Sequence, residues 1–330
     1  MKIVVLALLL LASVDGFAAP AARTVVKQSG SKATLAPRLH APVPASLHLR
    51  GGTTAIQSSL AGVLTGATGI PAVAGIAAAA GTLAYIRQAY IFSLSYGLSM
   101  LGIGGAVLLA SPGPLLLQVH AGLVAAYGGR LFAFLLWRQR FQPGYDGEAR
   151  LRALDKTPRL KRTPIILSTA LFYALMSSPL VYHFQSSPLS GVGAVVSAVG
   201  CVVAAVGLIY EAVADQQKSL FKMALRADSK EDAQCTSGVY AQSRHANYFG
   251  ELVFWSGATL AGVPAVLAAS VPLWVRAIRA VCSGLGLAGI YFIMLSATKR
   301  LEARQEEKYK SSAGFDDYMK NSNALFPKLW

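Results

Sequence analysis

Residues 192–213, VGAVVSAVGCVVAAVGLIYEAV, decide the fold class of this 330-residue chain. The run carries no charged side chain before Glu211. Its length matches the roughly 20 apolar residues that a helix needs to cross a bilayer. A chain in lipid satisfies its backbone polar groups only in helices or closed barrels. We therefore predict a transmembrane helix here.

Further apolar runs of similar length lie on both sides of this one. The chain is 54% hydrophobic and 14% charged, whereas a soluble domain carries roughly 25% charged residues, so an ordinary water-soluble enzyme is disfavoured. The sequence predicts an all-α, polytopic membrane helix bundle of about seven transmembrane helices, at Leu60–Ile86, Tyr90–Ala110, Leu115–Trp137, Pro164–Phe184, Val192–Val213, Phe249–Ala269 and Leu273–Thr298.

The charges of the links predict the orientation of this bundle. Lys and Arg total 30 against 15 Asp and Glu, which gives a formal net charge of +15. The links at 111–114 and 185–191 carry no charge, whereas basic residues concentrate in the links at 138–162 and 218–244 and in the tail at 299–310. By the positive-inside rule, the charged links share a cytosolic or stromal face.

Two arginines are exceptions to this pattern. Arg276 and Arg279 open the last predicted span, close to the uncharged face, where their side chains are expected to snorkel. The rest of the basic charge lies in membrane links and in the N-terminal leader, without an aromatic and basic platform. We therefore expect membrane lipids and a lipid-like small molecule as partners, and no nucleic acid.

The N-terminus reads as a targeting leader. Lys2, a short apolar run and small residues at Ser13 and Gly16 predict a signal peptide over residues 1–16. Residues 17–57 are basic, lack acids and begin with Phe17, which resembles the second part of a bipartite presequence for secondary plastids. A plastid membrane is thus expected, with a plain secretory signal and the ER membrane as the alternative. The membrane domain spans 58–330.

Three polar clusters fall on the charged face and suggest a nucleotide site. Arg244 and His245 precede a predicted helix start, where free N–H groups favour an anion. The guanidinium groups of Arg300 and Arg304 match phosphate oxygens. The remaining candidates donate to or accept from amides, hydroxyls or phosphates: Glu211, Asp215, Lys222, Asn247 and Tyr248. The alternative is an internal salt-bridge network linking helix ends, with Glu251 paired to an arginine. No cysteine or histidine spacing suggests a metal.

The second half of the chain resembles the steroid 5-alpha-reductase C-terminal domain family. The likeness is closest to an uncharacterised branch with the pattern Ser-Arg-His-x-Asn-Tyr-Phe-Gly-Glu, here residues 243–251, and ends at Phe326-Pro327. It implies a seven-helix reductase fold that holds NADPH in a cofactor half of about residues 192–330. The resemblance implies that the same nine positions bind the cofactor: Glu211, Asp215, Lys222, Arg244, His245, Asn247, Tyr248, Arg300 and Arg304.

The same resemblance implies a proton donor and a reaction. Tyr127, three residues before Arg130, matches a tyrosine that polarises the substrate carbonyl in steroid reductases. The chain departs from that pattern because it has no acid between Asp15 and Asp146, and Ala246 replaces a proline of the branch. The implied function is therefore an NADPH-dependent membrane oxidoreductase that reduces a double bond of a lipid, sterol or isoprenoid-like substrate.

Two other functions stay open at this point. The motif shape also resembles that of membrane methyltransferases acting on isoprenylcysteine or phospholipid, which use S-adenosylmethionine; Glu306 and Glu307 would serve there. The second alternative is a non-catalytic lipid-binding membrane protein that has kept the fold and lost the chemistry.

Overall fold

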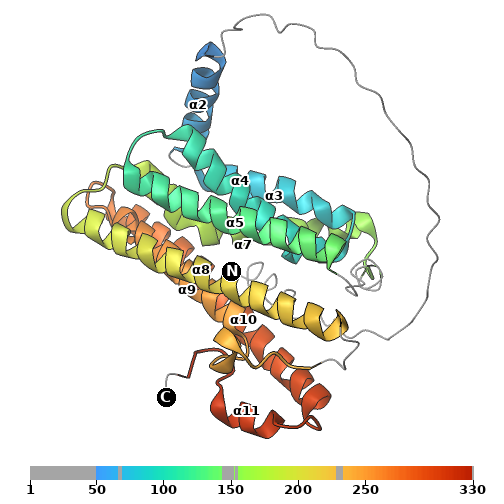
Figure 1. Ribbon diagram of the computed structural model, residues 1–330. Coiled ribbons are helices and arrows are strands. Elements are labelled where there is room, and N and C mark those ends of the chain that lie inside the picture. Colours follow the sequence, from blue (N-terminus) through green and yellow to red (C-terminus); the bar gives the residue numbers. More distant parts are fainter. Residues whose placement is uncertain (1–49, 66–68, 143–151, 153–154, 228–232, 329–330) are drawn as a thin grey trace, which may run out of the picture.

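A computed structural model describes residues 50–65, 69–142, 152, 155–227 and 233–328 of the chain. The described part is helical, with one isolated bridge between Ser243 and Asn323 (Figure 1). The predicted signal peptide, and residues 17–49 of the predicted transit segment, lie outside the described residues. The elements are α2 Arg50–Leu64, α3 Gly69–Gly81, η2 Thr82–Tyr85, η3 Gln88–Phe92, α4 Leu94–Ala110, α5 Leu115–Phe141, η4 Arg159–Arg162, α7 Thr163–Ser186, α8 Gly191–Ala227, η5 Gly238–Ala241, α9 Ala246–Val266, α10 Leu273–Tyr309 and α11 Phe315–Asn321.

The all-α polytopic membrane bundle is confirmed, with fewer spans than expected. Among the described residues, 5 helices are long and apolar enough to cross a membrane, or 6 if the bent pair Ile56–Leu64 and Gly69–Tyr85 forms one span. The first predicted run is thus broken after Leu64. The second is divided between η3 and the 17-residue α4, which ends just before the prolines of residues 111–114, where a helix cannot continue.

Glycines let α8 and α9 pack closely. A Cβ atom on Gly207 would meet the backbone of Phe254, and one on Gly257 would meet the backbone of Ala204. Such small residues allow backbone approach in membrane bundles. Gly250 makes the same kind of contact with Glu211, so the close packing of α8 on α9 brings a carboxylate against the first turns of α9.

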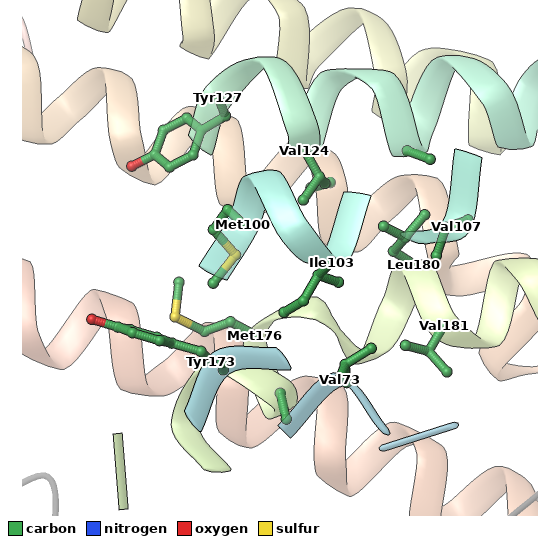
Figure 2. Close-up of a cluster of buried hydrophobic side chains, with 14 of the residues drawn as sticks. Val73, Met100, Ile103, Val107, Val124, Tyr127, Tyr173, Met176, Leu180 and Val181 are labelled. Carbon is green, nitrogen blue, oxygen red and sulfur yellow. The ribbon is translucent and has the colours of Figure 1, made fainter. Parts of the chain in front are cut away.

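The buried core joins α3, α4, α5 and α7. Its members include Val73, Met100, Ile103 and Leu180, which Figure 2 shows converging from these helices. Tyr127 and Tyr173 lie at one end of the cluster with their hydroxyl groups directed away from it (Figure 2). The hydroxyl group of Tyr127 donates to Tyr96 of α4, and that of Tyr173 donates to the Ile91 carbonyl of η3.

Candidate functional site

A cavity of about 410 Å³ lies between α4, α7, α9 and α10, within the 300–1,000 Å³ typical of small-molecule sites. One face of α10 lines it, first with apolar residues and then with Arg300 and Arg304. We call Tyr248, Glu251, Arg300 and Arg304 the polar end. The other lining residues are Phe92, Tyr96, Phe172, Tyr173, Met176, Ile290, Ile293, Met294, Ala297 and Leu301.

The Tyr96 hydroxyl is the best-positioned polar group of the cavity wall. It donates to Oε1 of Glu251 at 2.9 Å, and it accepts from Nε1 of Trp255 at 2.6 Å and from the Tyr127 hydroxyl at 3.2 Å. A phenol oxygen has one donor and two acceptor positions, so all three are used. The proton of Tyr96 is thereby directed at Glu251.

Tyr127, the predicted proton donor, is not among the lining residues of this cavity. It is fully buried, and its ring stacks on Phe254 with centroids 4.2 Å apart. Its hydroxyl reaches the cavity through Tyr96. Sequence reasoning missed Tyr96 because it lies in the second predicted span and outside the quoted motifs. It also did not predict that Glu251 of α9 lies beside Tyr96 of α4.

Glu211 and Asp215 hold an arginine of the bundle. Nη2 of Arg130 lies 2.5 Å from Oε1 of Glu211, and its Nη1 lies 2.5 Å from Oδ2 of Asp215. The Arg130 guanidinium also lies 5.7 Å from the centroid of the Tyr127 ring. These two carboxylates thus form part of an internal ion-pair network, which is the alternative that the sequence left open. Glu251, however, accepts a hydrogen bond from Tyr96, and among the described residues it forms no ion pair with an arginine.

Arg244 and His245 both bind Glu302 of α10. Nη2 of Arg244 lies 2.5 Å and Nε2 of His245 lies 2.8 Å from the oxygens of this carboxylate. Nη1 of Arg244 also donates to the Ser322 carbonyl at 2.5 Å. The two residues predicted to bind a cofactor anion therefore join α9 to α10 and to the C-terminal segment.

The C-terminal segment folds back over residues 233–245. The Arg244 amide donates to the Asn323 carbonyl at 2.9 Å, and the Tyr318 hydroxyl donates to the Tyr240 carbonyl at 2.7 Å. Burial is the main cause that raises the pKa of Tyr318 to about 12, so its hydroxyl remains a donor at neutral pH. Nζ of Lys222, another predicted cofactor residue, donates to the Ala233 carbonyl at 2.5 Å. Figure 1 shows α11 beyond the end of α10.

Three predicted cofactor residues do line the cavity, namely Tyr248, Arg300 and Arg304. The Tyr248 ring stacks on His245 with centroids 5.6 Å apart. The charges of Glu251 and Arg300 act on its hydroxyl in opposite directions. Asn247 is half-buried and is not among the lining residues. Apart from Asn247, the structure thus divides the predicted set into a cavity group and a group whose contacts join helix ends.

The cavity suits part of an amphipathic anion, namely its charged group together with the apolar ring or chain next to that group. Two arginines and a phenol at the polar end match phosphate oxygens and hydroxyl groups, and the apolar wall suits a ring or a hydrocarbon chain. Glu306 and Glu307, which the methyltransferase alternative would use, are exposed and do not line the cavity. The lining residues therefore fit an anionic group at the polar end and an apolar group along the rest of the cavity.

Comparison with known proteins identifies one family. The model of the family described as "Protein of unknown function (DUF1295)" matches residues 95–322. The matched region begins in α4 and includes Tyr96, Glu251 and the polar end. No curated protein and no solved structure gives a significant match.

Proposed function

This chain belongs to the DUF1295 family of unknown function, and we propose that it is a membrane-embedded, NADPH-dependent reductase of a lipid-like double bond. The observation that carries the proposal is the Tyr96–Glu251 pair, 2.9 Å apart, in the wall of a cavity that also contains Arg300 and Arg304. A proton donor and a cationic end thus meet in one apolar cavity. The motif resemblance to steroid 5-alpha-reductases supports the same reaction class.

The charge of the polar end favours NADPH over S-adenosylmethionine. NADPH carries several phosphate charges, whereas the reacting centre of S-adenosylmethionine is a cationic sulfonium. Arg300 and Arg304 attract the first and repel the second. The methyltransferase alternative is therefore the weaker of the two.

Each polar residue around Tyr96 would have its own role in the reaction. When bound, NADPH supplies a hydride to an electron-poor carbon of the substrate. Tyr96 then gives its proton to the oxygen or carbon that becomes electron-rich, by turning its O–H from Glu251 to the substrate. Trp255 and Tyr127 still donate to the Tyr96 oxygen and stabilise the negative charge that forms on it. Glu251 accepts the Tyr96 hydrogen bond in the resting site.

The apolar wall indicates the class of substrate. Met176 of α7 and Ile290, Ile293 and Met294 of α10 line the part of the cavity away from the arginines. A hydrocarbon or isoprenoid group gains free energy when it leaves water for such surfaces, roughly 25 cal/mol per Å². The proposed substrate is therefore an unsaturated lipid whose reacting group lies near Tyr96.

Cofactor binding by the purified chain tests the proposal first. NADPH fluorescence and thermal shift should show saturable binding in detergent. Combining Arg300→Gln with Arg304→Gln should weaken that binding at least tenfold, because hydrogen bonds between charged groups contribute about 1.5–3 kcal/mol each. Arg159→Gln is the matched control, since it removes an exposed arginine of η4 away from the cavity.

S-adenosylmethionine serves as the competing ligand in the same assay. Saturable binding of S-adenosylmethionine without NADPH binding would support the methyltransferase. Absence of binding by both cofactors would support the non-catalytic lipid-binding protein. In either case the reductase proposal would be abandoned.

A further inference from the structure

Two arginines lie at the end of the bundle opposite the polar end. Arg276 and Arg279 occupy the first turns of α10. At a rise of about 1.5 Å per residue, Arg276 lies about 36 Å along the helix from Arg300. The links at 111–114 and 187–190, which share this face, contain no charged residue. Charged side chains in a membrane protein are costly and are usually paired, so two cations on an otherwise uncharged face indicate an anionic partner.

Arg279 is held in place by neutral oxygens. Its Nη1 donates to the Ala265 carbonyl at 3.0 Å and to the Ser186 hydroxyl at 3.2 Å, and its Nη2 donates to Oε1 of Gln185 at 2.9 Å. The Tyr182 ring lies 4.9 Å from the guanidinium carbon. Ala265 and Ser186 belong to the last turns of α9 and α7, whose dipoles favour a cation. These contacts fix the guanidinium, and none of these partners is a carboxylate.

Arg276 lies one turn before Arg279, on the same side of α10. Within the described part of the chain no hydrogen bond or ion pair to Arg276 occurs, and its Nε is buried without a partner. Beside it, Leu273 and Trp274 are 74% and 68% exposed. Tryptophan is enriched where a membrane meets water, so this turn of α10 lies at the depth of lipid headgroups.

We propose that Arg276 and Arg279 bind the phosphate of an anionic phospholipid headgroup in the leaflet opposite the polar end. A guanidinium has five N–H donors arranged to match phosphate oxygens. Arg279 uses three of them internally and keeps two, while all five of Arg276 await an acceptor. One phosphate would accept from the guanidinium of Arg276 and neutralise two neighbouring positive charges. This site is separate from the cavity and does not depend on the proposed reductase activity.

Lipid binding by the full chain tests this proposal. The protein is placed in phosphatidylcholine nanodiscs with or without phosphatidylglycerol, and lipid retention is followed by native mass spectrometry together with the melting temperature. We expect one phosphatidylglycerol to be retained preferentially and the melting temperature to rise. Arg276→Gln should weaken this binding about tenfold or more. Arg159→Gln, which removes an exposed arginine of the charged face, should leave it unchanged.

Folding and the source of the phosphate are controlled separately. Arg276→Gln removes no internal contact of the described residues, so its melting temperature in phosphatidylcholine alone should equal that of the wild type. Arg276→Lys keeps the charge without the planar fork and should give an intermediate affinity. The proposal is overturned if Arg276→Gln binds phosphatidylglycerol like the wild type, or if inorganic phosphate added to phosphatidylcholine nanodiscs stabilises the protein as much as phosphatidylglycerol does.

Discussion

The Tyr96 hydroxyl donates to Oε1 of Glu251 at 2.9 Å and thereby joins α4 to α9 across 155 residues of sequence. The pair lines the same cavity as Arg300 and Arg304 of α10. It brings a carboxylate to an early helix that has none of its own. The first prediction concerns this hydrogen bond.

Tyr96→Phe should lower turnover by about 10²–10⁴-fold, the usual contribution of a positioned proton donor, while NADPH affinity changes little. The measurement is the rate of NADPH oxidation with a membrane lipid extract as the source of substrate. Tyr173→Phe is the matched control, because Tyr173 lines the same cavity but donates to the Ile91 carbonyl at 2.9 Å. Equal losses in both variants would show that Tyr96 acts through packing alone.

Arg130→Gln should destabilise the bundle by about 3 kcal/mol, because it leaves the side chains of Glu211 and Asp215, 5% and 11% exposed, without their cation. Thermal unfolding in detergent measures the effect. Adding Glu211→Gln and Asp215→Asn to the same protein should restore part of the loss.

The control for this prediction lies on the same helix. Arg140 is exposed near the end of α5, and Arg140→Gln should change the melting temperature by little. An Arg130→Gln protein as stable as the wild type would contradict a structural role for the Arg130 ion pairs.

Glu302→Gln should loosen the C-terminal segment. The substitution weakens the ion pairs with Arg244 and His245, whose side chains are 8% and 2% exposed. Residues 315–328 should then exchange amide hydrogens faster and be cleaved sooner by protease, while α5 and α7 keep their protection. Glu306→Gln, an exposed change one turn later on α10, should leave the segment protected. Unchanged protection in Glu302→Gln would mean that backbone hydrogen bonds such as Arg244 to Asn323 suffice.

Gly207→Ala should destabilise the packing of α8 on α9, because the new methyl group would meet the backbone of Phe254. We expect a loss of about 1–3 kcal/mol, the usual cost of overpacking, seen as a lower melting temperature. Gly284→Ala is the opposite case, since nothing lies within 4 Å of the added atom. There the better helix propensity of alanine should raise stability by about 0.5–1 kcal/mol. A change in stability of the same sign in both variants would contradict the close contact between Gly207 and the backbone of Phe254.

The fold class could be predicted because it depends on apolar runs longer than a bilayer requires. Residues 192–213 do lie in α8, which runs from Gly191 to Ala227. The span count was less accurate, since a run such as Leu60–Ile86 has the composition of a span even where the helix is broken. The amino-acid composition of a segment indicates whether it lies in lipid, but it does not predict the bend between α2 and α3.

The site was predicted only in part because sequence motifs do not encode partners. Arg244 and His245 have the chemistry of anion ligands, yet Glu302, 58 and 57 residues later, occupies both. Tyr248, Arg300 and Arg304 do line the cavity. Tyr96 carries no local signal, because a tyrosine in an apolar run reads equally well as packing. Only the packing of α4 near α9 brings the Tyr96 hydroxyl to Glu251.

The contacts of Glu302 set an order of assembly during synthesis. Arg244 and His245 leave the ribosome before Glu302. Ser322, whose carbonyl also accepts from Arg244, follows later still. Until α10 has entered the membrane, two side chains destined for burial lack their carboxylate. Insertion of α10 is therefore the step that supplies the shared carboxylate for both side chains.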